Sequence, residues 1–305
     1  MLGRIVEIAE DQRHLSAERG FMLVTNLQHT ILGRIPLDDI AAVIVQAHGA
    51  SYSNNLLVAL AQRGAPLVLC AANHNVVGML ISVDGNFQQA KRFDAQIAAT
   101  QPRMKRLWAE LVKAKLQQQA SALEAVGAPS VPLSALVTKV RSGDPDNVEA
   151  QGARRYWGLL FGDTFRRNSD GDGLNALLNY GYTVLRAATA RAVVAAGLHP
   201  TLGLHHSNAG NAMRLVDDLM EPFRPLVDLK VWHLQRQGQC EVTPDTKRAL
   251  VRTLYDDMQT SLGATPVMVC LQRLAVSLVQ VFLGERDKLD LPLPGLPLDL
   301  AADLT

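Results

Sequence analysis

Alternating apolar and polar positions mark the first part of the chain as a series of short β-strands. Five segments there are β-branched or alternate in polarity and are bounded by turn residues: 4–8, 21–25, 40–46, 66–70 and 76–82. Between the third and the fourth, Ser53 opens a run with helical spacing that closes at Gly64. These patterns predict a small, mainly β domain that contains one helix.

Beyond the turn at 84–86 the pattern changes to long runs with helical spacing, rich in Ala, Leu, Gln and Lys. Helices are predicted at 88–98, 102–125, 133–141, 146–161, 174–196, 208–220, 222–236, 244–260 and 266–283. Loops are predicted at 127–132, 162–173 and 197–206, and the proline-containing tail 289–305 is expected to be loosely ordered. The fold class is therefore α+β, with a β-rich domain over 1–85 and a larger, all-α domain over 86–305.

Composition indicates a globular chain that folds without covalent cross-links. A length of 305 residues with 48% hydrophobic composition is enough for a sizeable core. Cys70, Cys240 and Cys270 are isolated in the sequence, which predicts buried thiols rather than a disulfide framework or a zinc site. The N-terminus lacks a secretory pattern and no segment is long and apolar enough to span a bilayer, so we expect a soluble cytoplasmic protein.

Charge is unevenly distributed along the chain, although the formal net charge is only +1. Residues 101–200 carry 13 basic and 8 acidic side chains, against 7 and 8 in 1–100 and 10 and 13 in 201–305. A basic middle could neutralise the phosphates of a nucleic acid. The alternative, which charge alone favours, is that these side chains form the solvated faces of helices.

The first segment with candidate chemistry is D-P-D-N-V-E-A-Q-G-A-R-R-Y-W at 144–157. Glu149 falls in the first turns of a predicted helix, where the helix dipole favours a carboxylate. Tyr156 lies two turns further along the same face, whereas Arg154 lies off that face. Taken alone, Glu149 fits either a metal ligand or a carboxylate that only stabilises the helix end.

The second segment is the loop G-L-H-P-T-L-G-L-H-H-S-N at 197–208, which follows a long apolar helix. Its glycines and proline are typical of loops that hold functional side chains in place. His199, His205 and His206 are three of the eight histidines of the chain and lie close together. Such a cluster points to metal binding or proton transfer, although single loop histidines are usually exposed or cap a helix.

The third segment is L-V-D-D-L-M-E-P-F-R-P-L-V-D at 215–228. Asp218 and Glu221 are three residues apart and should share one helix face, where two like charges repel unless a cation lies between them. Pro222 is expected to end or kink this helix. A solvated acidic helix end is the alternative, but the apolar neighbours Leu219 and Phe223 favour metal binding.

Carboxylates and one imidazole, without a thiolate, suit Mg²⁺ or Mn²⁺ better than structural zinc. Such an ion acts on phosphoryl oxygen, because it polarises the scissile phosphate and activates an attacking water or hydroxyl. Spacing alone does not show that Glu149, His206 and Glu221 meet.

Taken in order, these segments resemble the CRISPR-associated adaptation integrases of the Cas-one family, and most of all its type II members. The shared patterns are E-x-x-x-x-R-x-Y-W, G-L-x-P-x-x-G-x-x-H and D-D-L-M-E-P-F-R-P-L-V-D, together with L-N-Y-G-Y-T-V-L at 178–185. The resemblance covers essentially the whole chain. It implies a small N-terminal β domain, through which the family forms homodimers, and a larger helical catalytic domain.

By resemblance, Glu149, His206 and Glu221 match the catalytic metal ligands of the family, and Asp218 matches a supporting carboxylate. His205 directly precedes the family histidine, which leaves open which of the two imidazoles coordinates the metal. Candidate DNA contacts share a basic or aromatic side chain close to these motifs: Arg154, Arg155, Tyr156, Arg166, Arg167 and Arg224.

The resemblance implies a metal-dependent DNA endonuclease and integrase that inserts short DNA fragments, or spacers, into a CRISPR array. A 3′-hydroxyl of the captured DNA would attack a phosphodiester at the repeat boundary. Implied partners are double-stranded DNA, a second copy of the chain, the small Cas-two protein in a heterohexamer, and Cas-nine in type II systems. The alternatives are a structure-selective nuclease of branched DNA and a non-enzymatic DNA-binding scaffold.

Overall fold

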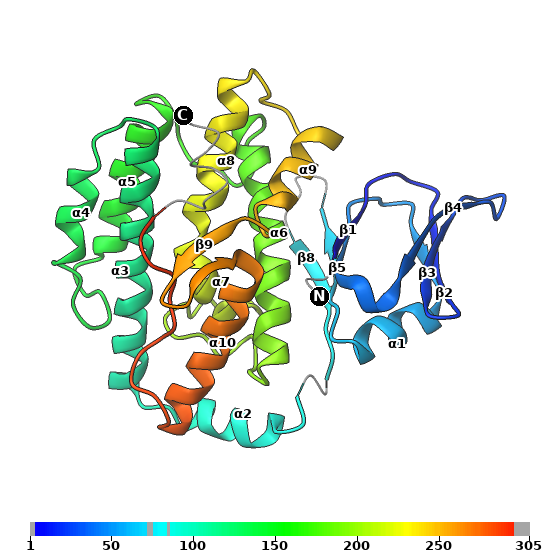
Figure 1. Ribbon diagram of the computed structural model, residues 1–305, viewed down its shortest axis with the longest axis horizontal. Helices are drawn as coiled ribbons and strands as arrows, with labels where there is room; N and C mark the ends of the chain where they lie inside the picture. Colours follow the sequence, from blue (N-terminus) through cyan, green and yellow to red (C-terminus); the bar gives the residue numbers. More distant parts are fainter. Residues whose placement is uncertain (1–3, 72–75, 84–85, 296–305) are drawn as a thin grey trace.

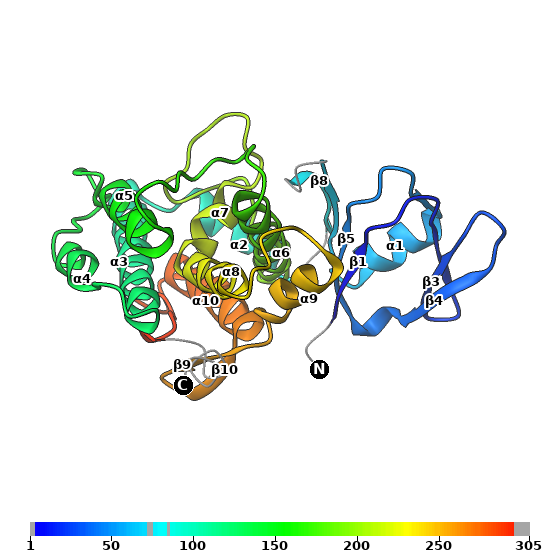
Figure 2. The same cartoon turned by 90° about the horizontal axis from the view of Figure 1, so that it is seen from above.

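The computed structural model describes residues 4–71, 76–83 and 86–295. A strand-rich N-terminal part lies beside a larger, mostly helical part (Figure 1), which confirms the predicted α+β class. Figure 2 shows the same two parts from above, with one sheet seen edge-on between the helices and the outer strands. None of the described helices combines the length and apolarity needed to cross a membrane.

Among its described residues, the N-terminal part contains two four-stranded sheets. In the first the strand order is β1 (Arg4–Ile8), β5 (Ile40–Val45), β7 (Leu67–Cys70) and β8 (Val76–Leu80), with only β8 antiparallel to its neighbour. In the second it is β4 (Ile31–Pro36), β3 (Phe21–Thr25), β2 (His14–Glu18) and β6 (Ser51–Tyr52). A short 3-10 helix, η1 (Leu37–Asp39), and α1 (Asn54–Gln62) complete this part.

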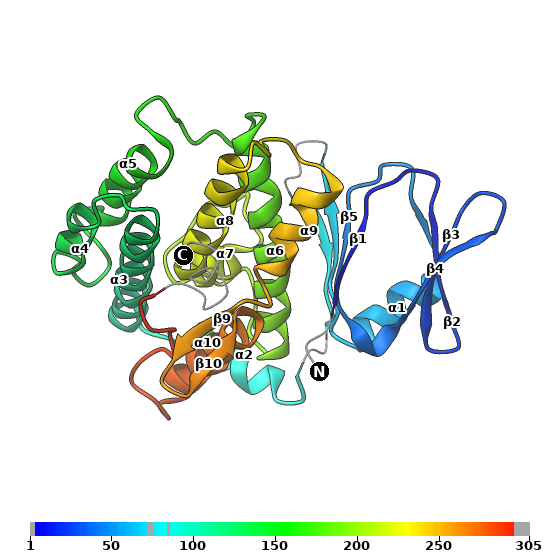
Figure 3. The same ribbon diagram turned by 45° about the horizontal axis from the view of Figure 1, so that its top comes forward.

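Strand β5 joins the two hydrophobic cores that the described residues form, because every one of its residues is buried. Val43 and Val45 face the smaller core under α1, whereas Ala42 and Ile44 belong to the large core of the helical part. The alternation of side chains along a strand explains this division. The first sheet therefore lies between α1 on one side and the helices on the other (Figure 3).

The helical part is arranged around α6, whose residues are mostly buried. Its elements are α2 (Gln89–Ile97), α3 (Gln101–Ala125), α4 (Val131–Val137), α5 (Val148–Phe161), α6 (Leu174–Ala195), α7 (Arg214–Met220), η2 (Glu221–Phe223), α8 (Arg224–Arg236), α9 (Pro244–Arg252) and α10 (Val267–Leu283). A Cβ atom at Gly181 would lie 2.4 Å from Val227 Cγ1, so α6 and α8 can approach this closely only with glycine at that position. Helices α3, α4 and α5 form the side farthest from the N-terminal sheets (Figures 1 and 3).

Several sequence predictions are wrong in detail. Strands β2, β4 and β6 were missed, and the helix predicted to start at residue 208 begins at Arg214. The helix predicted over 244–260 ends at Arg252, because the chain turns into a hairpin of β9 (Asp257–Thr260) and β10 (Gly263–Pro266). Gly263 has a φ of +97° at this turn, a conformation that glycine adopts without strain. The domain predicted to be all-α therefore contains a small β-sheet, formed by β9 and β10.

The start of the C-terminal tail is held against the helical part, contrary to the expectation of loose order. Leu293 N donates to Gln259 O at 2.9 Å, and Gln118 Nε2 donates to Leu293 O at 3.0 Å. Asp290 forms an ion pair with Arg273 at 2.8 Å. The rest of the predicted tail, 296–305, lies outside the described residues.

Candidate active site

Two carboxylates that are distant in the sequence meet at one buried ammonium group. Lys115 Nζ, on α3, donates to Glu149 Oε1 of α5 at 2.6 Å and lies 2.5 Å from Glu221 Oε2 of η2. Arg224 Nε lies 2.9 Å from the other oxygen of Glu221. Lys115 is only 8% exposed and Glu221 only 4%. The structure therefore brings together two of the three predicted metal ligands and adds a cation that lies between them.

Lys115 was not singled out from the sequence, where it was only one of the basic residues of the middle third. Its place on α3 carried a signal, because Trp108, Leu111 and Val112 lie at helical spacing before it and are all buried. A lysine on the apolar face of an amphipathic helix needs a buried partner. The residue type therefore pointed to an acidic partner but did not say which one.

Glu149 is fixed at the start of α5 by a network of cap residues. Asp144 accepts from Val148 N at 2.9 Å and from Glu149 N at 3.0 Å, and Asn147 Oδ1 accepts from Ala150 N at 3.3 Å. These contacts satisfy backbone donors that a helix start leaves free. The sequence prediction that Glu149 lies in the first turn is confirmed. The caps fix its backbone, and its side chain reaches Lys115 on α3.

Asp218 organises the histidine loop between α6 and α7. Its two carboxylate oxygens accept from the backbone N–H groups of Leu204 at 2.6 Å, His205 at 3.2 Å and His206 at 3.3 Å. Its Oδ1 also lies 2.6 Å from His206 Nδ1. At Gly203 a Cβ atom would lie 2.9 Å from Asp218 Oδ2, so this turn requires glycine. The spacing of Asp218 and Glu221 had suggested that they share a cation. In the structure the fully buried Asp218 supports the histidine loop instead.

The adjacent histidines have different surroundings. The ring of His205 stacks on the buried ring of Trp108, with 4.4 Å between centroids and 2° between planes. His206 meets Trp108 edge-on at 5.7 Å. Because Asp218 engages Nδ1 of His206, the Nε2 atom of this ring is the one left for another ligand. His199 is turned away from both, since it packs against Phe93 and its ring Nδ1 accepts from Thr201 N.

Electrostatics link His206 to the carboxylate pair. Burial alone would raise the pKa of Glu221, but the charges of Arg224, Lys115 and His206 together lower it. The hydrogen bond to Asp218 raises the pKa of His206, and the charges of Asp218 and Glu221 act in the same direction. His206 and Glu221 thus act on each other across the site, with no hydrogen bond between them among the contacts of the described residues.

The donor set suits a hard divalent cation, since two carboxylates already surround one positive nitrogen atom and an imidazole lies within electrostatic reach. Within the described ranges no three His, Cys, Asp or Glu side chains are arranged to hold a metal ion together. The position between the carboxylates belongs to Lys115 Nζ instead. A metal at this place would therefore have to compete with an ammonium group.

A polar cavity of about 390 Å³ is lined by Arg224, the residue that pairs with Glu221. It is lined by His206, Tyr182 and Asn179 and by three arginines, Arg167, Arg186 and Arg224. Asn179 Oδ1 holds Arg167 at 2.6 Å, and Asp217 accepts two hydrogen bonds from Arg186 at 2.7 and 2.8 Å. Because these guanidinium groups are held in place, the cavity can receive an anion such as a phosphate without large rearrangement.

The remaining candidate DNA contacts differ in how far their side chains are exposed to solvent. Arg154, Arg155 and Arg166 are exposed, although Arg166 donates to backbone carbonyls of its own loop. Arg167 lines both the polar cavity and a second cavity, of about 570 Å³, beside Trp157. Tyr156 is fully buried in the large core, so its proposal as a DNA contact is wrong.

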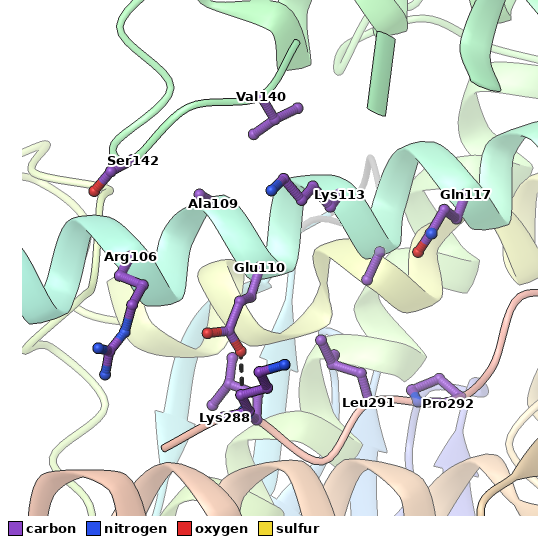
Figure 4. A pocket seen from close by; sticks show the side chains of 12 residues that line it. Arg106, Ala109, Glu110, Lys113, Gln117, Val140, Ser142, Lys288, Leu291 and Pro292 are labelled. Carbon is purple, nitrogen blue, oxygen red and sulfur yellow. Dashed lines mark hydrogen bonds between the residues drawn. The ribbon is translucent and has the colours of Figure 1, made fainter. Parts of the chain in front are cut away.

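A further cavity of about 520 Å³ lies on the other side of α3 (Figure 4). Lys113 lines it together with Arg106 and Lys288, while Glu110 Oε2 accepts from Leu289 N at 3.0 Å. Positions 113 and 115 point to nearly opposite faces of a helix. This cavity is therefore separate from the carboxylate pair.

The contact between Asp218 and His206 makes one prediction for proton binding. We expect the pKa of His206 to lie above its usual 6.5 and to fall when Asp218 is replaced by Asn, because the largest cause of the shift is lost. The pKa of His206 is higher in the folded protein than in the unfolded chain. The contact with Asp218 therefore stabilises the fold fully at pH values below the pKa of the unfolded chain. This stabilisation is lost as the pH rises through the pKa of the folded protein. NMR titration of the histidine ring protons, assigned with His206→Gln, measures the shift. An unchanged pKa in Asp218→Asn would contradict this account.

Comparisons with known proteins agree on one family. Residues 6–252 match the family model described as CRISPR associated protein Cas1. A CRISPR-associated endonuclease Cas1 from Neisseria meningitidis serogroup C (strain 8013) is 36% identical over 286 residues, which cover 92% of each chain. One from Pyrobaculum aerophilum is 27% identical over 252 residues, covering 77% of this chain and 84% of the relative.

Solved structures show the same fold. A casposase bound to an integration product superposes with a TM-score of 0.81 at 17% identity, covering 94% of this chain and 92% of that one. A Cas1 protein from Thermotoga maritima superposes with a TM-score of 0.74 at 16% identity, covering 93% of this chain and 98% of that one. The extent of the family match and the identity to the Neisseria relative decide the assignment: the chain belongs to the Cas1 family of CRISPR-associated proteins.

Proposed function

We propose that this chain is a divalent-metal-dependent DNA endonuclease and integrase that inserts short DNA fragments into a CRISPR array. The observation that carries the proposal is the meeting of Glu149 and Glu221 at one buried cation. His206 acts electrostatically on Glu221 and, together with Arg224, lines a cavity that contains three arginines. Relatives named as endonucleases support the cleavage activity. The fold shared with a casposase bound to an integration product is consistent with joining.

Glu149, Glu221 and His206 would hold Mg²⁺ or Mn²⁺, which when bound supplies a Lewis acid that polarises a phosphoryl oxygen and activates an attacking oxygen. Asp218 holds His206 by Nδ1, so that Nε2 is free for coordination. The presence of an imidazole favours Mn²⁺, because Mg²⁺ prefers shells made only of oxygen.

The arginines of the polar cavity would bind and orient the DNA backbone. Guanidinium groups bind phosphate through two parallel hydrogen bonds, and Arg167 and Arg186 are already held by Asn179 and Asp217. In joining, the 3′-hydroxyl of the captured DNA forms a new P–O bond with an array phosphate. The P–O bond to the leaving 3′-oxygen breaks, so one phosphodiester replaces another without nucleotide hydrolysis.

The partners are proposed from the names of the structural neighbours and from the resemblance. Neighbours include a Cas6-RT-Cas1–Cas2 complex and a complex of a Cas1 protein with DNA. We infer that this chain binds double-stranded DNA and pairs with a second copy through its β-rich part, residues 1–85. A Cas2 dimer would join two such pairs, and Cas9 would take part in a type II system.

The joining reaction can be tested with a short duplex, a supercoiled array plasmid, the Cas2 partner and Mn²⁺. A covalent product should form when the duplex carries 3′-hydroxyls and should be absent with 3′-dideoxy ends or with EDTA. Product from dideoxy ends would contradict attack by the 3′-hydroxyl. Cleavage of branched DNA without any joined product would instead favour a structure-selective nuclease, and failure to bind Mn²⁺ would favour a non-enzymatic scaffold.

A further inference from the structure

Lys115 occupies the position that the proposed metal ion would need. Its Nζ atom lies 2.6 Å from Glu149 Oε1 and 2.5 Å from Glu221 Oε2, and its side chain is only 10% exposed. A divalent cation bound by the same two oxygens cannot share the space with an ammonium group, because like charges at such a short distance repel strongly. Binding of one must therefore release the other.

We propose that Lys115 is an exchangeable internal cation, which neutralises Glu149 and Glu221 in the metal-free protein and is displaced when a divalent ion binds between them. The inference rests on the proposed metal-dependent function and adds to it a residue of this chain that controls metal loading. Lys115 is in this sense a positioning residue, since it keeps the two carboxylates together before the ion arrives.

The environment of Glu221 shows why such a cation is needed. Its Oε1 pairs with Arg224 at 2.9 Å, but Glu149 has no second cation among its described ion pairs. Without Lys115, Glu149 would face Glu221 with no cation of its own, and removing one partner from a largely buried ion pair is destabilising. Lys115 therefore keeps the site folded while it is free of metal.

A buried amide oxygen on the same helix could accept the displaced ammonium group. Gln119 lies one turn beyond Lys115 on α3, on the same face. It is 3% exposed, and in the part of the chain that the structure describes its buried Oε1 atom has no hydrogen-bond partner. Because this oxygen lies 3.6 Å from where a Cβ of Gly152 would be, it faces α5, the helix that carries Glu149. Movement of Lys115 towards Gln119 would satisfy both groups.

Calorimetric titration of the full-length protein with MnCl₂ tests the exchange. Lys115→Met should bind Mn²⁺ at least about tenfold more tightly than the wild type, a gain of about 1.4 kcal/mol. Lys115→Arg should bind it more weakly than the wild type, because a guanidinium group pairs with carboxylates through two hydrogen bonds and is harder to displace. Lys113→Met, an exposed position on the opposite face of α3, should bind as the wild type does.

Thermal unfolding of the same proteins gives a second measurement. Lys115→Met should melt at a lower temperature than the wild type without metal and should gain more from added Mn²⁺. If Lys115→Met does not fold without metal, the Lys115→Arg titration decides, and wild-type affinity in that variant overturns the exchange.

Other outcomes separate the two proposals. One outcome is that the wild type binds Mn²⁺, loses this binding in Glu221→Gln and shows no tighter binding in Lys115→Met. That result overturns the exchange but supports the metal site. Absence of Mn²⁺ binding in the wild type and in a folded Lys115→Met overturns both the metal site and the exchange.

Discussion

Replacing Glu149 by glutamine is expected to lower the rate of DNA joining by at least about a thousandfold while leaving the fold intact. Metal catalysis contributes several kcal/mol to transition-state stabilisation, and about 4 kcal/mol corresponds to that factor. The amide has nearly the same size but lacks the charge that would hold the ion. Single-turnover joining rates of a short labelled duplex with Mn²⁺ and an array plasmid would measure the effect.

The matched control is Glu110→Gln, on the opposite side of α3 (Figure 4). Glu110 accepts a hydrogen bond from Leu289 N, and the glutamine oxygen can keep this contact. Its joining rate should stay within about twofold of the wild type, as for a surface substitution that removes no functional contact. A Glu149→Gln variant that joins DNA at a similar rate would exclude Glu149 from the proposed metal site.

The local parts of the site could be predicted from the sequence because their causes are local. Glu149 follows Asp144 and Asn147, which cap the helix whose first turn contains it, and cap residues act within one turn. The glycines and proline of the histidine loop similarly indicated a fixed loop before α7. The same holds for β1 and β3, whose predicted bounds match the structure.

The other parts depend on contacts between distant segments. Asp218 and Glu221 are three residues apart, and spacing alone suggested a shared cation. In the structure Asp218 turns to the backbone of the histidine loop, while Glu221 turns to Lys115 on α3. The packing of η2 against α3 determines which side chain faces which partner, and this packing cannot be inferred from the local sequence. The hairpin after α9 was missed for a related reason, since pairing of β9 with β10 outweighs local helical spacing.

A buried acid below the polar cavity gives the fold an unusual dependence on pH. Asp228 is 2% exposed and accepts a hydrogen bond from the Tyr182 hydroxyl. Burial raises the pKa of Asp228 from 3.8 to about 7, although the hydroxyls of Tyr182 and Tyr156 and the charge of Arg224 oppose this shift. Between these two pKa values the folded state holds a proton that the unfolded state has lost. The free energy of unfolding therefore falls as pH rises through this range.

Asp228→Asn should remove this dependence, because the amide does not titrate. From pH 5 to pH 8 the stability of the variant should rise relative to the wild type by about 2–3 kcal/mol, since the wild type alone must bury a charge at the higher pH. Urea unfolding of both proteins at the two pH values measures the change. Asp146→Asn, an exposed carboxylate paired with Arg141, should show little such change. A stability difference between Asp228→Asn and the wild type that stays constant from pH 5 to pH 8 would mean that Asp228 is charged throughout, with its burial offset by Arg224 and the two tyrosines.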